Sequence, residues 1–130
     1  MLKLLPDEWN ILVKENPRQN YGGFPNFRRF HYRNISEYRE LFDLPRVVPL
    51  SVSITSETVL KHCKLTASCT GSILWEGMLK GKPGISFGSH WHNSCKSSPH
   101  INDILNEKFP LNILLNKSQG EVIEDIQAFL

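Results

Sequence analysis

Short predicted strands alternate with predicted helices along the whole chain, and this alternation restricts the possible folds more than any other feature. Residues rich in β-forming side chains occupy four short segments, at 9–14, 46–50, 64–68 and 84–87. Helical patterns follow the first three of them, at 34–44, 53–62 and 72–80. This order predicts an α/β fold with a Rossmann-like parallel sheet of about four strands flanked by helices.

Further helices are expected near the end of the chain. A short helix is predicted at 101–108, and Ser118 with Glu121 forms a capping-box pattern before a last helix. Ligands of parallel sheets bind beyond the carboxyl ends of the strands. The loops after Lys14, Leu50, Ser68 and Phe87 are therefore the places where a site is expected.

Length and composition limit the classes of protein that remain. The 130 residues suit a single domain spanning 1–130, and the net charge of +2 is too small to indicate nucleic-acid binding. No apolar run approaches the length of a transmembrane segment. Three cysteines and the absence of a secretory leader pattern predict a cytoplasmic location, with peripheral association at the inner membrane face left open.

The segment from Ser68 to Glu76 carries the strongest local signal. Small residues between a strand and a helix let backbone N–H groups approach an anion, and the hydroxyls of Thr70 and Ser72 can donate as well. Glu76 lies one helical turn after Ser72, where a carboxylate can accept hydrogen bonds from a ribose diol. An ordinary helix N-terminus with an exposed glutamate explains the same pattern equally well.

The run Thr70 to Gly77, followed by Gly81-Lys82-Pro83 and Phe87-Gly88, resembles a recurrent pattern of capsule polysaccharide biosynthesis proteins. These proteins are similar to GT-B glycosyltransferases, and the pattern belongs to their C-terminal, donor-binding half. The segment 13–17 resembles an upstream Lys-Glu-His-Pro element of the same group, and 124–130 resembles their closing helix. The resemblance implies a domain that binds a nucleotide sugar of UDP or CMP type as substrate, with no other cofactor.

The resemblance also implies a role for individual residues. Gly71 and Ser72 would contact the donor phosphate, and Glu76 would hold the ribose. Near the nucleotide it would place Lys14, Asn16 and Pro17 after the first strand, and the loop of Gly88, His90 and His92 after the last. Asn16 stands where the family pattern has histidine, so this position cannot carry positive charge. No catalytic residue is nominated, because the general base of such enzymes comes from the acceptor half.

Three interpretations of the histidine-rich loop stay open. His90, His92, Cys95 and His100 are potential zinc ligands, but their spacing matches no standard zinc motif. A loop that closes over the donor is the leading interpretation, ahead of a surface loop and a metal site, and no metal ligand is assigned. Cys63 and Cys69 are expected to be small buried side chains rather than nucleophiles.

Compared with a complete GT-B half, the chain lacks a first strand and helix, so the fold is expected to be truncated on its N-terminal side. The strands around Ile11 and Leu65 would then pair directly, receive a strand from another chain, or belong to a longer protein. An acceptor-binding domain or a second copy of the chain is the expected partner. A non-catalytic remnant or assembly module is the main alternative function, and a sugar-nucleotide epimerase is the weakest.

Overall fold

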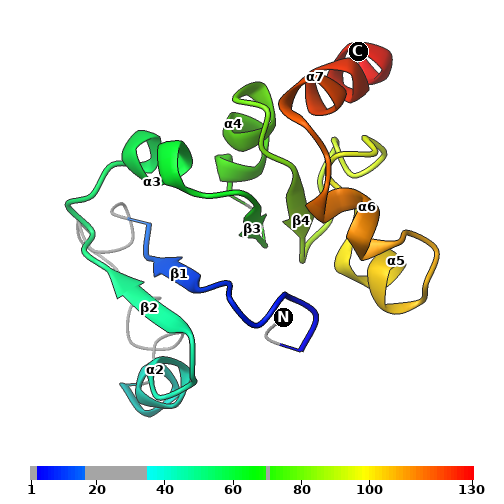
Figure 1. Ribbon diagram of the computed structural model, residues 1–130. Helices are drawn as coiled ribbons and strands as arrows, with labels where there is room; N and C mark the ends of the chain where they lie inside the picture. The colour runs from blue at the N-terminus through cyan, green and yellow to red at the C-terminus, as the bar shows by residue number, and fades with distance from the viewer. Residues whose placement is uncertain (1–2, 17–34, 70) are drawn as a thin grey trace. The chain divides into compact units, whose positions relative to one another are not determined.

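The computed structural model describes residues 3–16, 35–69 and 71–130, and the chain divides into two compact units, Met1–Thr55 and Ser56–Leu130 (Figure 1). The first unit contains β1 (Ile11–Lys14), α2 (Ile35–Phe42) and β2 (Val47–Leu50). The second contains α3 (Ser56–His62), β3 (Thr66–Ser68), α4 (Ile73–Leu79), β4 (Gly84–Ser86), α5 (Ile101–Leu105), α6 (Leu111–Leu115) and α7 (Gln119–Phe129).

In the first unit, β1 and β2 pair in parallel, with Ile11 opposite Val47 and Lys14 opposite Leu50. Arg46, in the turn before β2, has a positive φ of 66°, and its guanidinium donates to the carbonyl of Pro6 at 2.7 Å. This bond ties the segment before β1 to the turn before β2. The parallel orientation predicted for the strands is seen in this pair.

In the second unit, β4 is the central strand of a small parallel arrangement. β3 pairs with it on one side, with Thr66 opposite Gly84 and Ser68 opposite Ser86. On its other side, the amides of Gly84 and Ser86 donate to the carbonyls of Ser97 (2.8 Å) and Pro99 (3.0 Å), and Ser86 forms an isolated parallel bridge with His100. All three residues of β4 are buried as a result.

Two glycines let α4 lie unusually close to this sheet. A Cβ on Gly77 would lie 2.8 Å from Cγ2 of Thr66, and one on Gly84 would lie 2.8 Å from a methyl group of Leu74. Real Cβ atoms do not approach other atoms so closely. Leu74 of α4 is fully buried at this contact. The close approach sets the distance between α4 and the two strands.

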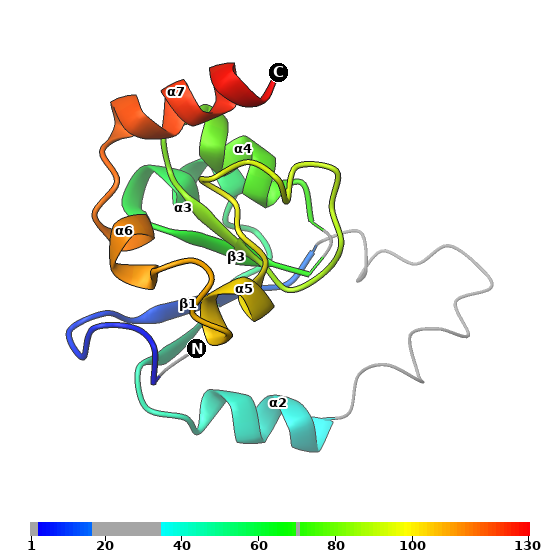
Figure 2. The ribbon, with the colours of Figure 1, turned by 90° about the vertical axis from the view of Figure 1, so that its right-hand side faces the viewer.

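The last helix, α7, packs beside α4, as Figure 2 shows. Its Val122 and Ile126 join Met78 and Cys95 in one buried cluster. The helix begins at a complete capping box, in which Ser118 accepts from the amide of Glu121 and the Glu121 carboxylate accepts from the amide of Ser118. The capping box predicted from the sequence is confirmed.

The architecture matches the expected class but not the expected sheet. The chain is a mixed α/β structure with short parallel strands, as predicted. The described strands form two two-stranded sheets, β1-β2 and β3-β4, where one sheet of about four strands was expected.

The helices also differ from expectation near the end of the chain. The helix predicted at 101–108 ends at Leu105, and α6 was not anticipated. Glu107 takes a φ of 58°, which a helix does not tolerate. Asn34, where the helical pattern 34–44 begins, lies outside the described residues. No helix in the described ranges has the length and apolar character needed to cross a membrane.

Gly77→Ala tests the close approach of α4. Alanine favours a helix over glycine by about 1 kcal/mol, but the clash with Thr66 is expected to outweigh this gain and lower the free energy of unfolding by about 1 to 2 kcal/mol. Urea denaturation followed by circular dichroism measures the change. Thr66→Ser, which removes the clashing methyl group, is expected to restore part of the loss in the double variant.

Gly120→Ala provides the matched control for this substitution. Gly120 also lies in a helix, but the nearest atom to an added Cβ is Oγ of Ser118, at 3.9 Å. This variant is expected to gain roughly 0.5 to 1 kcal/mol from helix propensity alone. A stabilised Gly77→Ala protein would contradict the packing described for α4.

Candidate functional site

The turn between β3 and α4 is held by hydrogen bonds of its own side chains. The amide of Gly71 donates to Oγ of Ser68 at 2.9 Å. Ser72 is the N-cap residue of α4, yet its hydroxyl donates to Oε1 of Glu76 at 2.6 Å instead of capping the helix. Ser72 and Glu76 are both exposed to solvent. Ser72, expected to contact the donor phosphate, and Glu76, expected to hold the ribose, are therefore bonded to each other.

This pairing bears on the roles that the resemblance implied for the turn. Glu76 holds the Ser72 hydroxyl, so its carboxylate would lie beside a phosphate bound at Ser72 and would repel it. A diol, in contrast, could replace the serine as the hydrogen-bond donor to the same carboxylate. Thr70, the third residue expected in this turn, lies outside the described residues. The ribose role of Glu76 and the phosphate role of Ser72 both stay predictions.

The loop that follows β4 reaches the same turn. Nε2 of His90 lies 2.9 Å from the backbone carbonyl oxygen of Cys69, at the end of β3. The carbonyl of Gly88 accepts from the Ser86 hydroxyl at 2.5 Å and from Nδ2 of Asn93 at 2.9 Å. The structure therefore brings together the turn after β3 and the loop after β4, which the sequence predicted separately.

Aromatic side chains surround this loop and form a ring cluster, defined here as Trp75, His90, Trp91, His92 and Phe129. Trp75 of α4 lies 4.7 Å from Trp91 between ring centroids, and Trp91 lies 5.7 Å from Phe129 of α7. The Trp91 side chain remains 63% exposed despite these contacts. The cluster thus fixes the ring of Trp91 while leaving much of it open to solvent.

His92 is the buried member of the ring cluster, with 2% of its surface exposed. Its Nδ1 lies 3.1 Å from Oγ of Ser98, and its ring stacks on His90 at 4.7 Å. Burial lowers the pKa of His92, and the charge of His90 lowers it further. The neutral imidazole is therefore the favoured form in this environment.

The cysteines and histidines of the loop point to different partners. Cys95 is buried in the core, and its thiol donates to the carbonyl of Asp125 at 3.8 Å. Burial raises the pKa of the Cys95 thiol, and likewise that of Cys63, so neither resembles an activated nucleophile. Within the described ranges, no three His, Cys, Asp or Glu side chains converge as metal ligands would. Cys69, expected to be buried, is exposed, because it lies on the turn beyond the end of β3.

Lys14 and Asn16 belong to the first unit, at the end of β1. Nζ of Lys14 donates to the backbone carbonyl of Glu15 at 3.3 Å, and Asn16 is exposed. The hydroxyl of Tyr38 on α2 donates to the Glu15 carboxylate, so α2 is tied to the end of β1. Pro17 lies outside the described residues. These residues stay candidates from the sequence alone.

A hydrogen-bond network of Ser97, Lys117 and Asp125, which was not predicted from the sequence, ties the end of the loop to α7. Oδ2 of Asp125 accepts from the Ser97 hydroxyl at 2.5 Å and from Nζ of Lys117 at 2.7 Å. Only 10% of the Lys117 side chain and 15% of that of Asp125 are exposed. Asp125 lies three residues after Val122 and one before Ile126, on the apolar side of α7. An acidic side chain there requires a partner, and this was the signal that could have revealed the network.

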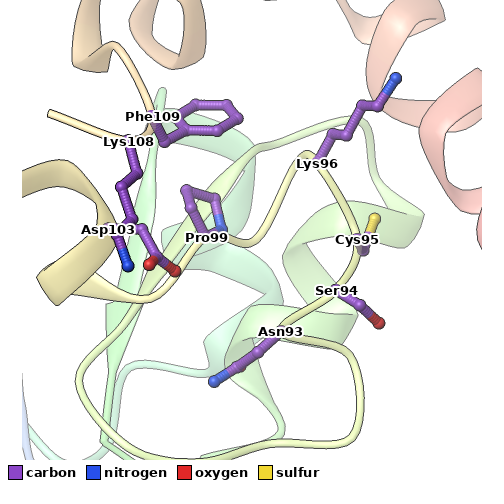
Figure 3. A pocket seen from close by; sticks show the side chains of 8 residues that line it. All are labelled: Asn93, Ser94, Cys95, Lys96, Pro99, Asp103, Lys108 and Phe109. Atoms are coloured by element: carbon purple, nitrogen blue, oxygen red, sulfur yellow. The ribbon is translucent and has the colours of Figure 1, made fainter.

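A small pocket of about 180 Å³ lies on the other side of this loop and is shown in Figure 3. It is lined by Asn93, Ser94, Cys95, Lys96, Pro99, Asp103, Lys108 and Phe109. Asp103 and Lys108 lie on one side of it and Asn93 on the other. Its volume is well below the roughly 300 Å³ at which ligand pockets begin. None of the residues predicted from the sequence to bind a nucleotide lines it.

Comparisons with known proteins give no relative from which a function could be transferred. No family model, no curated protein and no solved structure matches the chain. Any functional conclusion therefore depends on the chemistry of the turn and the loop themselves.

Asp125→Asn tests whether the network holds the loop in place. Removal of the charge leaves the largely buried Lys117 ammonium without its counter-ion, so the free energy of unfolding is expected to fall by about 2 kcal/mol. The control is Glu57→Gln, which breaks the exposed Glu57–Lys61 pair of α3 at 3.4 Å. That variant is expected to lose only roughly 0.3 kcal/mol. Equal losses in urea denaturation would show that Asp125 does not act as an anchor.

Proposed function

We propose that the chain is a nucleotide-sugar-binding domain of a glycosyltransferase-like protein in bacterial capsule or surface polysaccharide biosynthesis. The observation that supports this most is the contact between His90 and the Cys69 carbonyl, which joins the turn after β3 to the loop after β4. Both segments lie beyond the carboxyl ends of paired parallel strands, where ligands of parallel sheets bind. The family resemblance is densest between residues 68 and 88, a range that includes the turn and ends where the loop begins.

The turn offers the hydrogen-bonding groups that a ribose requires. The Glu76 carboxylate can accept from both hydroxyls of a diol once the Ser72 hydroxyl gives way. Because that bond is exposed to water, its exchange for a ligand bond costs about 1 kcal/mol at most. The loop adds the exposed ring of Trp91, against which a base or a sugar ring can stack. A donor of UDP or CMP type in the cytoplasm is the substrate class we favour.

The alternative of a non-catalytic assembly module also has support in the structure. The described strands form two small sheets rather than one continuous sheet, and the Ser72–Glu76 bond occupies the groups that a donor would need. Large apolar side chains are exposed at Leu79 of α4 and at Leu130. This alternative predicts a stable oligomer without nucleotide binding, with a second copy or an acceptor-binding domain as the partner.

Isothermal titration calorimetry of the full chain with UDP, CMP and GDP compounds separates the two functions. Binding by at least one compound is expected, and its absence in a folded sample would reject the donor-binding proposal. Glu76→Ala is expected to weaken binding of the nucleotide about tenfold, because a charged hydrogen-bond acceptor is lost. Binding of inorganic phosphate is expected to stay equal or to tighten, since a repelling charge is removed.

The matched control for this experiment is Glu57→Ala. It removes the same charge from an exposed position on α3 of the same unit. It is expected to leave both affinities within about twofold of the unmodified chain, as removal of a distant exposed charge is largely screened. Equal losses of nucleotide and phosphate in Glu76→Ala would contradict the ribose role.

A further inference from the structure

The ring of His92 lies at the centre of the loop contacts. It stacks on His90 (4.7 Å) and on Trp75 (6.1 Å), and it meets Trp91 edge-on at 5.3 Å. The hydroxyl of Ser98 holds Nδ1 at 3.1 Å. One buried ring thus contacts the histidine that reaches the β3–α4 turn and the tryptophan that remains exposed.

The surroundings of His92 are poorly suited to a positive charge. The side chain is 2% exposed, so a charged imidazole would lose nearly all of its hydration. His90, on the same loop, is the titratable group that acts on His92. A positive charge on His90 would repel a positive charge on His92. Trp75 faces it from α4 and could attract a cation through its ring face. Burial and the charge of His90 both lower the pKa of His92.

Two carboxylates on α4 and α7, the helices whose side chains contact the loop, have other partners. Glu76 of α4 accepts from Ser72, at the turn. Asp125 of α7 accepts from Lys117 and Ser97. Ser98, next in sequence to Ser97, faces His92 with an uncharged hydroxyl. Within the described ranges, no carboxylate is therefore bonded to the His92 ring to compensate its protonation.

We propose that His92 is a positioning residue that holds the loop of residues 88–92 against the β3–α4 turn only in its neutral form, and that its protonation releases the loop. When the ring leaves for water, Trp91 and His90 each lose one of the rings that pack against them, and the contact of His90 with the Cys69 carbonyl is weakened. Ligand binding at the turn is then weakened by acid, a consequence that rests on the proposed donor-binding function.

The direction of the pH dependence follows from the direction of the pKa shift. The pKa of His92 in the closed loop lies below the ordinary value of 6.5. The stabilisation of the closed loop is therefore complete above about pH 6.5, where both closed and released forms are neutral. It is lost progressively as the pH falls from there through the lowered pKa, because only the released loop takes up a proton readily.

NMR spectroscopy of the full chain without ligand, between pH 8 and pH 5, tests the proposal. The imidazole signals of His92 and the indole N–H signal of Trp91 are expected to change together in one transition with its midpoint below pH 6.5. In His92→Phe, which keeps a ring but cannot titrate, the Trp91 transition is expected to disappear. Titration of His92 near pH 6.5 with an unchanged Trp91 signal would overturn the proposal.

His90→Gln gives a second, independent variant in case His92→Phe does not fold. It leaves His92 in place and removes the neighbouring charge, so the midpoint is expected to move to higher pH. An unchanged midpoint would contradict the coupling of the two rings. His62→Phe, at an exposed position on α3, is the control and is expected to leave the Trp91 transition as it is.

Calorimetry with UDP at pH 8 and pH 5.5 tests whether release of the loop weakens ligand binding at the β3–α4 turn. The unmodified chain is expected to lose at least tenfold in affinity on acidification, whereas His92→Phe keeps most of its affinity. A loop transition without binding of any UDP, CMP or GDP compound at either pH would reject the donor-binding function and leave the role of His92 intact. UDP binding that weakens equally in both proteins would reject the regulatory role of His92 alone.

Discussion

The close contact of α4 with β3 and β4 is the constraint on which the second unit depends. Gly77 has no side chain that could clash with Thr66, and Gly84 has none that could clash with Leu74. The helix can therefore lie closer to the strands than a methyl group at either position would allow. Leu74 is buried at this contact, at a gain of roughly 2 kcal/mol. The same contact places the turn of Ser68 to Ser72 at the edge of the strands and the ring of Trp75 under the loop.

Side chains of this turn are bonded within the turn itself. Ser68 accepts from the Gly71 amide, and Ser72 donates to Glu76 instead of capping α4. The arrangement therefore favours a ligand that exchanges its own hydroxyl groups for that of Ser72 over one that brings negative charge alone. Proximity of Glu76 strengthens this preference, since its carboxylate opposes an anion and attracts a diol.

Local patterns in the sequence predicted the elements well, and the longer-range arrangement poorly. The capping box at Ser118 and the strand at Ile11 depend on neighbouring residues, so their patterns are visible in the chain itself. The division into two small sheets depends on which strand edges meet, which no local pattern encodes. The segment from Ser97 to His100 extends the sheet beside β4 through backbone bonds alone, and its Ser-Ser-Pro-His sequence shows no strand pattern.

The candidate site was predictable in part for the same reason. The turn at Ser72 was recognisable because small residues and a carboxylate at one-turn spacing lie within one segment. The partners that fix the loop come from distant positions: Cys69 for His90, and Asp125 for Ser97. A histidine-rich segment with a nearby cysteine suggests metal ligands when read locally. The structure separates these side chains, because Cys95 faces the core whereas His90 faces the turn.

The connection from β4 to the 97–100 segment contains no helix, so side chains must fix its path. Residues of this loop alternate in the partner they face: His90 meets the turn, His92 meets Ser98, and Cys95 meets the core. Because the loop lacks the continuous backbone hydrogen bonds of a helix, its conformation depends strongly on each of these side-chain contacts. Displacement of the buried His92 ring is therefore expected to weaken the contacts of Trp91 and of the β3–α4 turn. This makes the loop the part of the second unit whose conformation a single protonation can change.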